Sequence, residues 1–192
     1  MYTIGNNALK ILSLYLSNYK KRYYLREISA LSRIPLKTTQ NTLKILKEES
    51  ILKSETVGKN RYFTLNMDNI NTRLYLMQAE IFRTSLFIEK YPLLKPFIKD
   101  FNTLSTPVAV FGSFARFKAT KASDLDILIV SGKTHSLPEH LVPPEIHKVF
   151  LSEKLFIEGI EKKEALIAEI FESHIILNSF SFFVNVMWDY YG

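Results

Sequence analysis

Apolar side chains recur at helical spacing through the first third of the chain, and two strand-like runs follow them. Leu9, Leu12 and Leu16 occupy one helical stripe, and Pro35 suits the first turn of a later helix. The pattern predicts helices over about 7–19, 25–32 and 35–49, and strands at Ile51–Thr56 and Arg61–Leu65. Gly58 lies between the two strands, where a tight turn favours a positive φ angle.

A long helix is expected next, over about 68–91, because Asp68 can cap its start and Pro92 discourages continuation. Apolar residues cover several of its sides, so it must bury more than one face, either between the two domains or against a second copy of itself. On the second interpretation we expect a homodimer. Beyond it, the pattern predicts strands at about 107–111, 123–130 and 146–151, and helices over 152–158, 160–173 and 174–191.

Charge is divided unevenly along the chain. The first 66 residues carry 12 Lys and Arg against 4 Asp and Glu, a net +8, whereas the other residues carry 13 against 15, a net −2. A basic module of this kind attracts phosphate backbones, although a solvated lysine-rich surface has the same composition. The chain has no cysteine, no apolar run as long as a membrane span and no secretion-signal pattern, so we expect a cytoplasmic protein.

Three helices followed by a hairpin resemble a winged helix-turn-helix domain, over residues 1–66. The resemblance implies that the third helix enters the major groove of double-stranded DNA and that the hairpin reaches phosphates. The residues that would then face DNA are Lys37, Thr38, Gln40, Asn41, Lys44, Lys59 and Arg61. The same fold also serves protein contacts and dimerisation, and that alternative stays open.

The candidate chemistry lies further along the chain, on the predicted strand 123–130. Asp124 and Asp126 are two positions apart there, so both carboxylates leave the same face. Two like charges this close are costly unless a cation lies between them, and oxygen ligands of this type suit Mg²⁺. An isolated Asp-x-Asp pair is also common at a solvated strand edge, so the neighbouring residues matter.

A small-residue bend precedes these acids and follows the predicted strand 107–111. Gly112 lets backbone approach a phosphate, and Ser113 offers a hydroxyl group and a backbone N–H. The segment between the bend and the acids supplies the positive charge that a triphosphate needs, from Arg116, Lys118 and Lys121.

The chain has, in this order, a strand, Gly112-Ser113, a short helix with Ala115-Arg116, a loop and Ser123-Asp124-Leu125-Asp126. This order resembles the small members of the DNA polymerase beta-type nucleotidyltransferase superfamily. The resemblance covers residues 95–192 and leaves 67–94 as a helical connector. It implies an α+β protein whose last domain has a mixed sheet flanked by helices.

The activity that this resemblance implies is transfer of a nucleoside monophosphate from an NTP to a protein or nucleic acid acceptor, with release of pyrophosphate. Catalysis and metal binding would fall to Asp124 and Asp126, which would hold two Mg²⁺ ions. Nucleotide binding would fall to Gly112, Ser113, Arg116, Lys121 and Ser123.

Two positions depart from that family pattern. Phe117 stands where small members usually have glycine, and the strand 146–151 lacks the third carboxylate that active members usually supply. Glu145 precedes that strand, and a histidine or lysine directed into the cleft would repel Mg²⁺. The alternatives are therefore a DNA-binding regulator whose second domain is a nucleotide sensor or dimeriser, and an interaction scaffold. Histidines 135, 140, 147 and 174 lack metal-ligand spacing and are interpreted as surface or packing residues.

Overall fold

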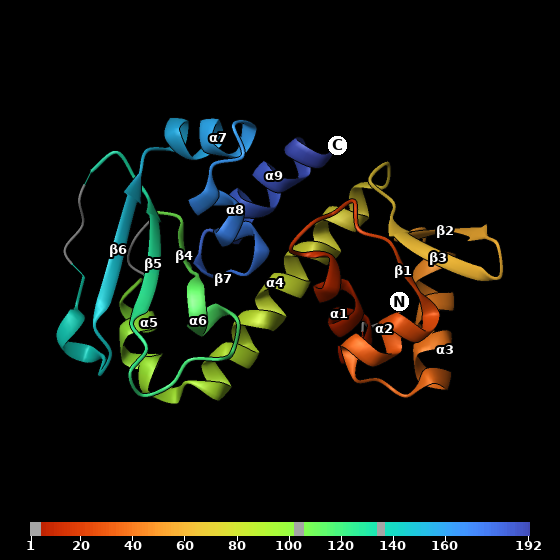
Figure 1. Ribbon diagram of the computed structural model, residues 1–192, viewed down its shortest axis with the longest axis horizontal. Helices are drawn as coiled ribbons and strands as arrows, with labels where there is room; N and C mark the ends of the chain where they lie inside the picture. Colours follow the sequence, from red (N-terminus) through yellow and green to blue (C-terminus); the bar gives the residue numbers. More distant parts are fainter. Residues whose placement is uncertain (1–4, 102–105, 134–136) are drawn as a thin grey trace. The chain divides into compact units, whose positions relative to one another are not determined.

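The computed structural model describes residues 5–101, 106–133 and 137–192. The chain divides into two compact units: residues up to Ala79 together with Met187–Gly192 form one, and Glu80–Val186 form the other. Both units combine helices with a sheet, so the predicted α+β class is confirmed (Figure 1). The domain boundaries expected at residues 66 and 94 stay a prediction. None of the helices in the described ranges is long and apolar enough to cross a membrane.

The N-terminal unit contains three helices and a small sheet. Its helical elements are α1 (Asn6–Leu12), the 3-10 turn η1 (Ser13–Tyr15), α2 (Leu25–Ser32) and α3 (Leu36–Glu48). Its strands are β1 (Tyr23–Tyr24), β2 (Leu52–Val57) and β3 (Asn60–Leu65), in the order β1-β3-β2 and all antiparallel. The three predicted helices and the hairpin are therefore present, and β1 is a short third strand that the apolar pattern did not predict.

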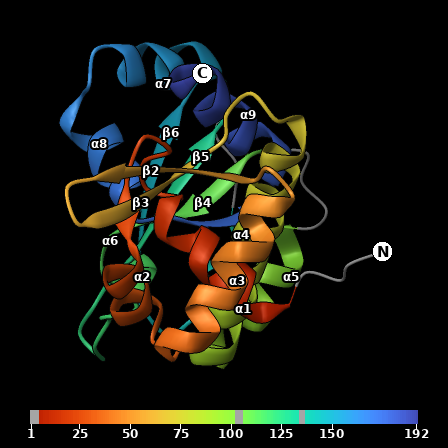
Figure 2. The ribbon, with the colours of Figure 1, turned by 90° about the vertical axis from the view of Figure 1, so that its right-hand side faces the viewer.

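Local backbone geometry explains where these elements turn. Arg33 ends α2 in the left-handed region, at φ 55°, and Pro35 precedes the first residue of α3. Gly58 adopts φ 61° between the paired residues Val57 and Asn60, as a tight hairpin requires. Figure 2 views this unit from the side of its hairpin, with α1, α2 and α3 grouped beside it.

The second unit is built on a four-stranded mixed sheet. Its strands are β4 (Val108–Val110), β5 (Leu125–Val130), β6 (Ile146–Leu151) and β7 (Ile175–Asn178), in the order β6-β5-β4-β7. The pair β5–β6 is parallel, and the other pairs are antiparallel. The helical elements of the unit, some shared with the N-terminal unit, are α4 (Ile70–Lys90), η2 (Pro92–Leu94), α5 (Lys95–Phe101), α6 (Gly112–Ala115), η3 (Glu139–Leu141), α7 (Glu153–Glu161), α8 (Ala165–Glu172) and α9 (Phe180–Tyr191).

Alternation along β5 buries both faces of this sheet. Ile127 packs into one apolar cluster with Phe97 of α5, and Leu128 packs into the opposite cluster with Phe156 of α7. The helices lie on both sides of the sheet in Figure 1. Because β5 is covered on both faces, its polar residues occupy its beginning, and that is where the candidate site forms.

One predicted element is wrong. We expected a helix over 174–191, but Ile175–Asn178 forms β7, which pairs antiparallel with β4, and α9 begins only at Phe180. A short apolar run fits a buried strand as well as a helix, and the open edge of β4 decides between them. Ser179 adopts φ 58° between the two elements and so separates them.

Candidate functional site

The two acids of the Asp-x-Asp pair lie at the start of β5, beside the bend that follows β4. The Phe111 N–H donates to the Asp126 carbonyl at 3.0 Å, which fixes the bend against the strand. Gly112 adopts φ 67° there, and a Cβ built on it would lie 2.2 Å from Oδ2 of Asp126. Only a glycine leaves room for this carboxylate, so the Gly112 bend and Asp126 form one packed feature.

His147 of β6 lies beside both acids. Because β5 and β6 are parallel with Asp126 opposite His147, the imidazole projects on the face that carries the carboxylates. Its Nδ1 is 3.5 Å from Oδ1 of Asp126, and its Nε2 is 3.8 Å from Oδ2 of Asp124. The side chains of Asp124, Asp126 and His147 are 45%, 28% and 56% exposed, so the group stays open to a ligand.

The sequence interpretation of His147 as a surface or packing residue missed this contact. The signal that could have found it is the pairing of 146–151 with 123–130, in a register that aligns position 147 with Asp126. Of the other histidines, His140 lies in η3, His174 is buried, and position 135 lies outside the described residues.

Burial raises the pKa of the Asp126 carboxyl above its ordinary value. The cause is loss of solvent around the carboxylate, and the negative charges of Glu169 and Asp124 add to it. His147 opposes the shift through its charge and its hydrogen bond. Burial and the neighbouring acids therefore disfavour ionisation of Asp126, a cost that a bound cation would offset.

Arg116 is exposed and pairs with two acids of α8. Its Nη2 donates to Oε1 of Glu169 at 3.0 Å and lies 3.9 Å from Oε2 of Glu172. The guanidinium expected to bind phosphate is thus paired with carboxylates, and an incoming triphosphate would compete with them.

The other predicted nucleotide-binding residues are Ser113, Lys121 and Ser123. Ser113 is half-buried on the Gly112 bend. Ser123 accepts a hydrogen bond from the Thr120 N–H at 2.9 Å. With Lys121 it lines a cavity of about 470 Å³, whose other walls include Tyr91 and Phe114.

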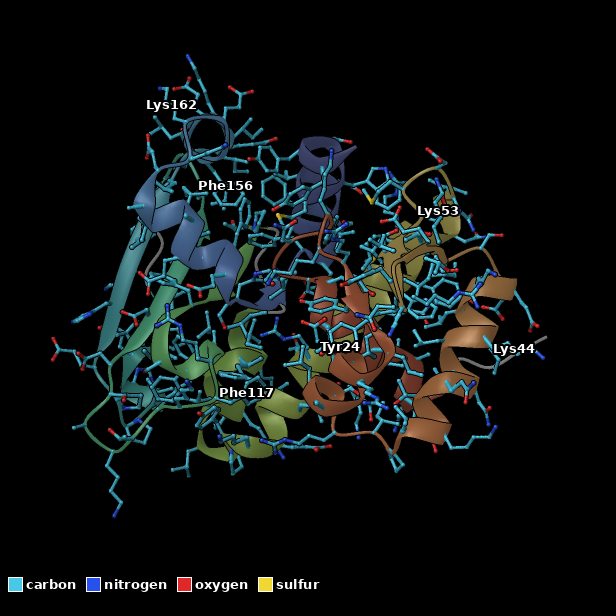
Figure 3. All side chains as sticks on the ribbon, turned by 45° about the vertical axis from the view of Figure 1, so that its right-hand side comes forward. Tyr24, Lys44, Lys53, Phe117, Phe156 and Lys162 are labelled. Atoms are coloured by element: carbon cyan, nitrogen blue, oxygen red, sulfur yellow. The ribbon has the colours of Figure 1, made fainter. Side chains whose placement is uncertain are left out.

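Phe117 occupies a backbone position that favours glycine. Its φ is 58°, in the left-handed region. Its ring stacks on Tyr91, with the centroids 6.5 Å apart and the planes inclined by 26°, and the Lys90 ammonium donates to its carbonyl. The aromatic side chain, labelled in Figure 3, thus packs against the end of α4 and η2.

The donor set fits a divalent cation in part. The carboxylates of Asp124 and Asp126 supply oxygen ligands on one face, and the Gly112 bend leaves space for one of them. The strand β6 contains no acid, and Glu145 before it is exposed. Within the described residues, no group of three or more His, Cys, Asp or Glu side chains is arranged to hold a metal ion. The position beside the pair is occupied by an imidazole.

A groove of about 650 Å³ runs along α3 in the N-terminal unit. Five of the seven residues expected to face DNA line it: Lys37, Gln40, Asn41, Lys44 and Arg61. Lys47, which the sequence analysis did not select, lines it as well. Thr38 is half-buried on α3 and Lys59 is exposed in the hairpin turn, both outside the described lining.

Comparison with known proteins identifies part of the second unit. Residues 93–178, from η2 to the end of β7, match the family model of the nucleotidyltransferase domain. No curated protein and no solved structure matches the chain. The match confirms the expected nucleotidyltransferase domain over these residues and supports a general nucleotidyl-transfer function. It covers the Gly112 bend, the acid pair and His147.

Proposed function

We propose that the chain transfers a nucleoside monophosphate from an NTP to a protein or nucleic acid acceptor and releases pyrophosphate. The observation that carries the proposal is the packing of the Asp126 carboxylate against the Gly112 bend, within the segment that matches the nucleotidyltransferase domain. A bend without a side chain beside paired carboxylates suits a polyphosphate bridged to protein by a divalent cation.

Each residue of the site has a distinct role in this proposal. Asp124 and Asp126 would hold the divalent cation, Mg²⁺ in the simplest case, and a bound cation would neutralise charge that develops on the phosphates. The backbone at Gly112 and the hydroxyl of Ser113 would contact the triphosphate. Arg116 would exchange its contact with Glu169 for a phosphate oxygen, since both are anionic partners for the same guanidinium.

Label transfer from NTPs tests this function. The protein is incubated with each labelled NTP and a divalent cation, and label is followed on the protein itself and on added nucleic acid or protein. Asp124→Asn and Asp126→Asn should lower transfer about hundredfold or more, because the charge holding the cation is lost. Asp189→Asn is the matched control, an exposed acid at the end of α9, and should leave transfer unchanged. Equal transfer by all four proteins would reject the catalytic assignment.

A second function, binding of double-stranded DNA, is favoured by the groove along α3. Its lining carries four cations, Lys37, Lys44, Lys47 and Arg61, against the single acid Glu48. Lys44 projects outward from α3 (Figure 3). In the winged helix-turn-helix arrangement that the sequence resembles, this face enters the major groove. If the second unit were a nucleotide sensor without transfer activity, DNA binding would be the function of the protein.

Duplex binding at several salt concentrations tests the second function. Lys44→Ala should weaken binding and reduce the slope of log affinity against log salt by about one, because one phosphate contact is lost. Lys162→Ala, an exposed lysine that pairs with Glu158 in the second unit, is the control. Binding that does not depend on salt, or that both variants weaken equally, would contradict it.

The homodimer expected from the sequence is part of the proposal. Ile70, Leu74 and Ile81 of α4 are exposed although large and apolar. Covering them with a second copy would remove this surface from water. Light scattering should give twice the chain mass, and Leu74→Glu should give the monomer mass.

A further inference from the structure

We propose that the second unit contains a binding site for a small aromatic anion, in the cavity of about 470 Å³ between the end of α4, η2 and the loop that precedes β5. The site is separate from the acid pair and goes beyond the proposed transfer of a nucleoside monophosphate. The inference rests on the place of the cavity in the sheet, on its aromatic wall, on its positive charge and on a buried hydroxyl group without a partner.

The cavity lies on the face of the sheet opposite the two carboxylates. Its wall residues Leu94 and Phe114 belong to the apolar cluster that contains Ile127 of β5. Because successive side chains of a strand point to opposite faces, Asp126 and Ile127 leave opposite faces. The end of α4 and the loop before β5 meet at the end of the sheet where β5 begins (Figure 1). A ligand in the cavity would therefore lie across the sheet from the acid pair.

Aromatic rings form one wall of the cavity. Tyr91 and Phe114 both line it, with their ring centroids 5.0 Å apart and their planes inclined by 57°. Tyr91 also contacts the rings of Phe87 and Phe117, which fixes its orientation. The cavity volume falls within the range of small-molecule sites, about 300–1,000 Å³, and fixed rings suit a flat apolar body. The rest of the apolar lining comes from Pro92, Leu93, Leu94, Pro143 and Pro144.

Two lysines give the cavity a positive charge that its lining does not balance. Lys90 and Lys121 line it, and none of the described lining residues is acidic. The Lys90 ammonium lies 5.6 Å from the ring centroid of Tyr91 and 5.7 Å from that of Phe117, and it donates to the Phe117 carbonyl. These contacts hold one cation beside the aromatic wall, where it would attract an anionic ligand.

The Tyr91 hydroxyl adds a donor at the same wall. It is buried, and within the described part of the chain it has no hydrogen-bond partner. Buried hydroxyl groups in native proteins are normally paired, so a free one indicates a missing acceptor. The carboxylate of a ligand is such an acceptor. Two cations, an unpaired donor and a flat apolar wall together define an aromatic anion as the ligand.

Titration of the full-length protein with 2-naphthoate, an aromatic carboxylate that is ionised at neutral pH, tests the inference. Proton NMR measures the affinity, and cross-peaks between naphthalene protons and the Tyr91 ring report the position of the ligand. We expect a Kd of about 1 mM or lower. The neutral analogue 2-naphthamide and the saturated analogue decalin-2-carboxylate should each bind at least about threefold more weakly, because one lacks the charge and the other lacks the rings.

Three variants make the test specific. Thr120→Trp, at an exposed wall residue, fills the cavity and should abolish binding. Lys121→Gln removes one cation and should raise the Kd at least about threefold. Lys99→Gln, at an exposed lysine of α5 outside the lining, is the control and should leave the Kd unchanged. Circular dichroism confirms that each variant is folded.

Four results would overturn the inference: no binding of 2-naphthoate, equal affinity for 2-naphthamide, cross-peaks that do not involve Tyr91, or the same Kd in Lys121→Gln and Lys99→Gln. Competition with a nucleotide supplies a further test. Saturating NTP with Mg²⁺ should leave 2-naphthoate bound, whereas displacement would make the cavity part of the nucleotide site and reject a separate one.

Discussion

At the scale of single residues, Gly112 is the glycine with the least space for a side chain. Gly58 is its matched control: both have φ above 60°, but a Cβ at Gly58 would meet nothing within 4 Å, whereas one at Gly112 would collide with Asp126. Gly58→Ala should cost about 1–2 kcal/mol of unfolding free energy through backbone strain alone. Gly112→Ala should cost about 1 kcal/mol more and abolish metal binding, because the carboxylate must move.

Urea unfolding and metal calorimetry on the two glycine variants check this expectation. The constraint is absent if Gly112→Ala loses no more stability than Gly58→Ala and still binds metal.

At Phe117, replacement by glycine should destabilise the protein less than replacement by alanine, which is the reverse of the usual order. Its φ of 58° costs a non-glycine residue about 1–2 kcal/mol, while its ring gains contact with Tyr91 and Phe87. Phe117→Ala loses the ring and keeps the strain, but Phe117→Gly loses both. The glycine variant should therefore be about 1 kcal/mol more stable than the alanine variant, with both below the unaltered protein. Urea unfolding measures the difference, and an alanine variant as stable as the glycine variant would contradict it.

Asp126 makes the metal-free protein sensitive to pH. Burial raises its pKa in the folded state, so the folded protein binds this proton more tightly than the unfolded chain does. The stabilisation is fully present below the ordinary carboxyl pKa of 3.8 and is lost as pH rises through the raised value. In chelator, Asp126→Asn should therefore melt above the unaltered protein at neutral pH and lose that advantage in acid.

Thermal melts across this pH range, with Asp189→Asn as the exposed control, measure the effect. If the melting temperature of Asp126→Asn rose further above that of the unaltered protein as pH fell, the predicted direction of the pH dependence would be wrong.

At the scale of elements, a buried pair joins α4 to the segment before β7. Nε2 of His174 lies 2.9 Å from Oε1 of Glu80, and Nδ1 donates to the Ile170 carbonyl at 3.1 Å. The two side chains are 4% and 2% exposed. Glu80→Ala should lower the unfolding free energy by about 1–3 kcal/mol, because it leaves a buried polar partner unpaired.

Glu89→Ala is the control for this pair, on an exposed position of the same helix, and should change stability by less than about 0.5 kcal/mol. Similar losses from the two substitutions, measured by urea unfolding, would show that the buried pair contributes no more than a surface residue.

Local pattern was sufficient for most elements but not for the strands β1 and β7. The bounds of α2 and β6 follow directly from spacing and flanking residues. The strand β7 did not, because Ile175–Asn178 carries no local signal that separates strand from helix, and its pairing with β4 joins residues far apart in sequence. The same limit applies to the candidate site. Spacing predicted that Asp124 and Asp126 share a face, but the approach of His147 depends on strand register.

At the scale of the whole molecule, the two units carry different chemistry. The basic groove of the N-terminal unit suits a nucleic acid backbone, and the second unit contains the nucleotidyltransferase match with its acids and imidazole. The excess of Lys and Arg ends near residue 66, so the net positive charge of the sequence lies in its N-terminal part.

The position of the transferred label tests nucleotidyl transfer most directly. The protein is supplied with an NTP labelled in the α-phosphate and, separately, in the γ-phosphate, and the acceptor and the released pyrophosphate are both counted. We predict that label from the α-phosphate enters the acceptor, that label from the γ-phosphate leaves in pyrophosphate, and that Asp126→Asn abolishes both. Label from the γ-phosphate in the acceptor, or transfer undiminished in Asp126→Asn, would contradict the account.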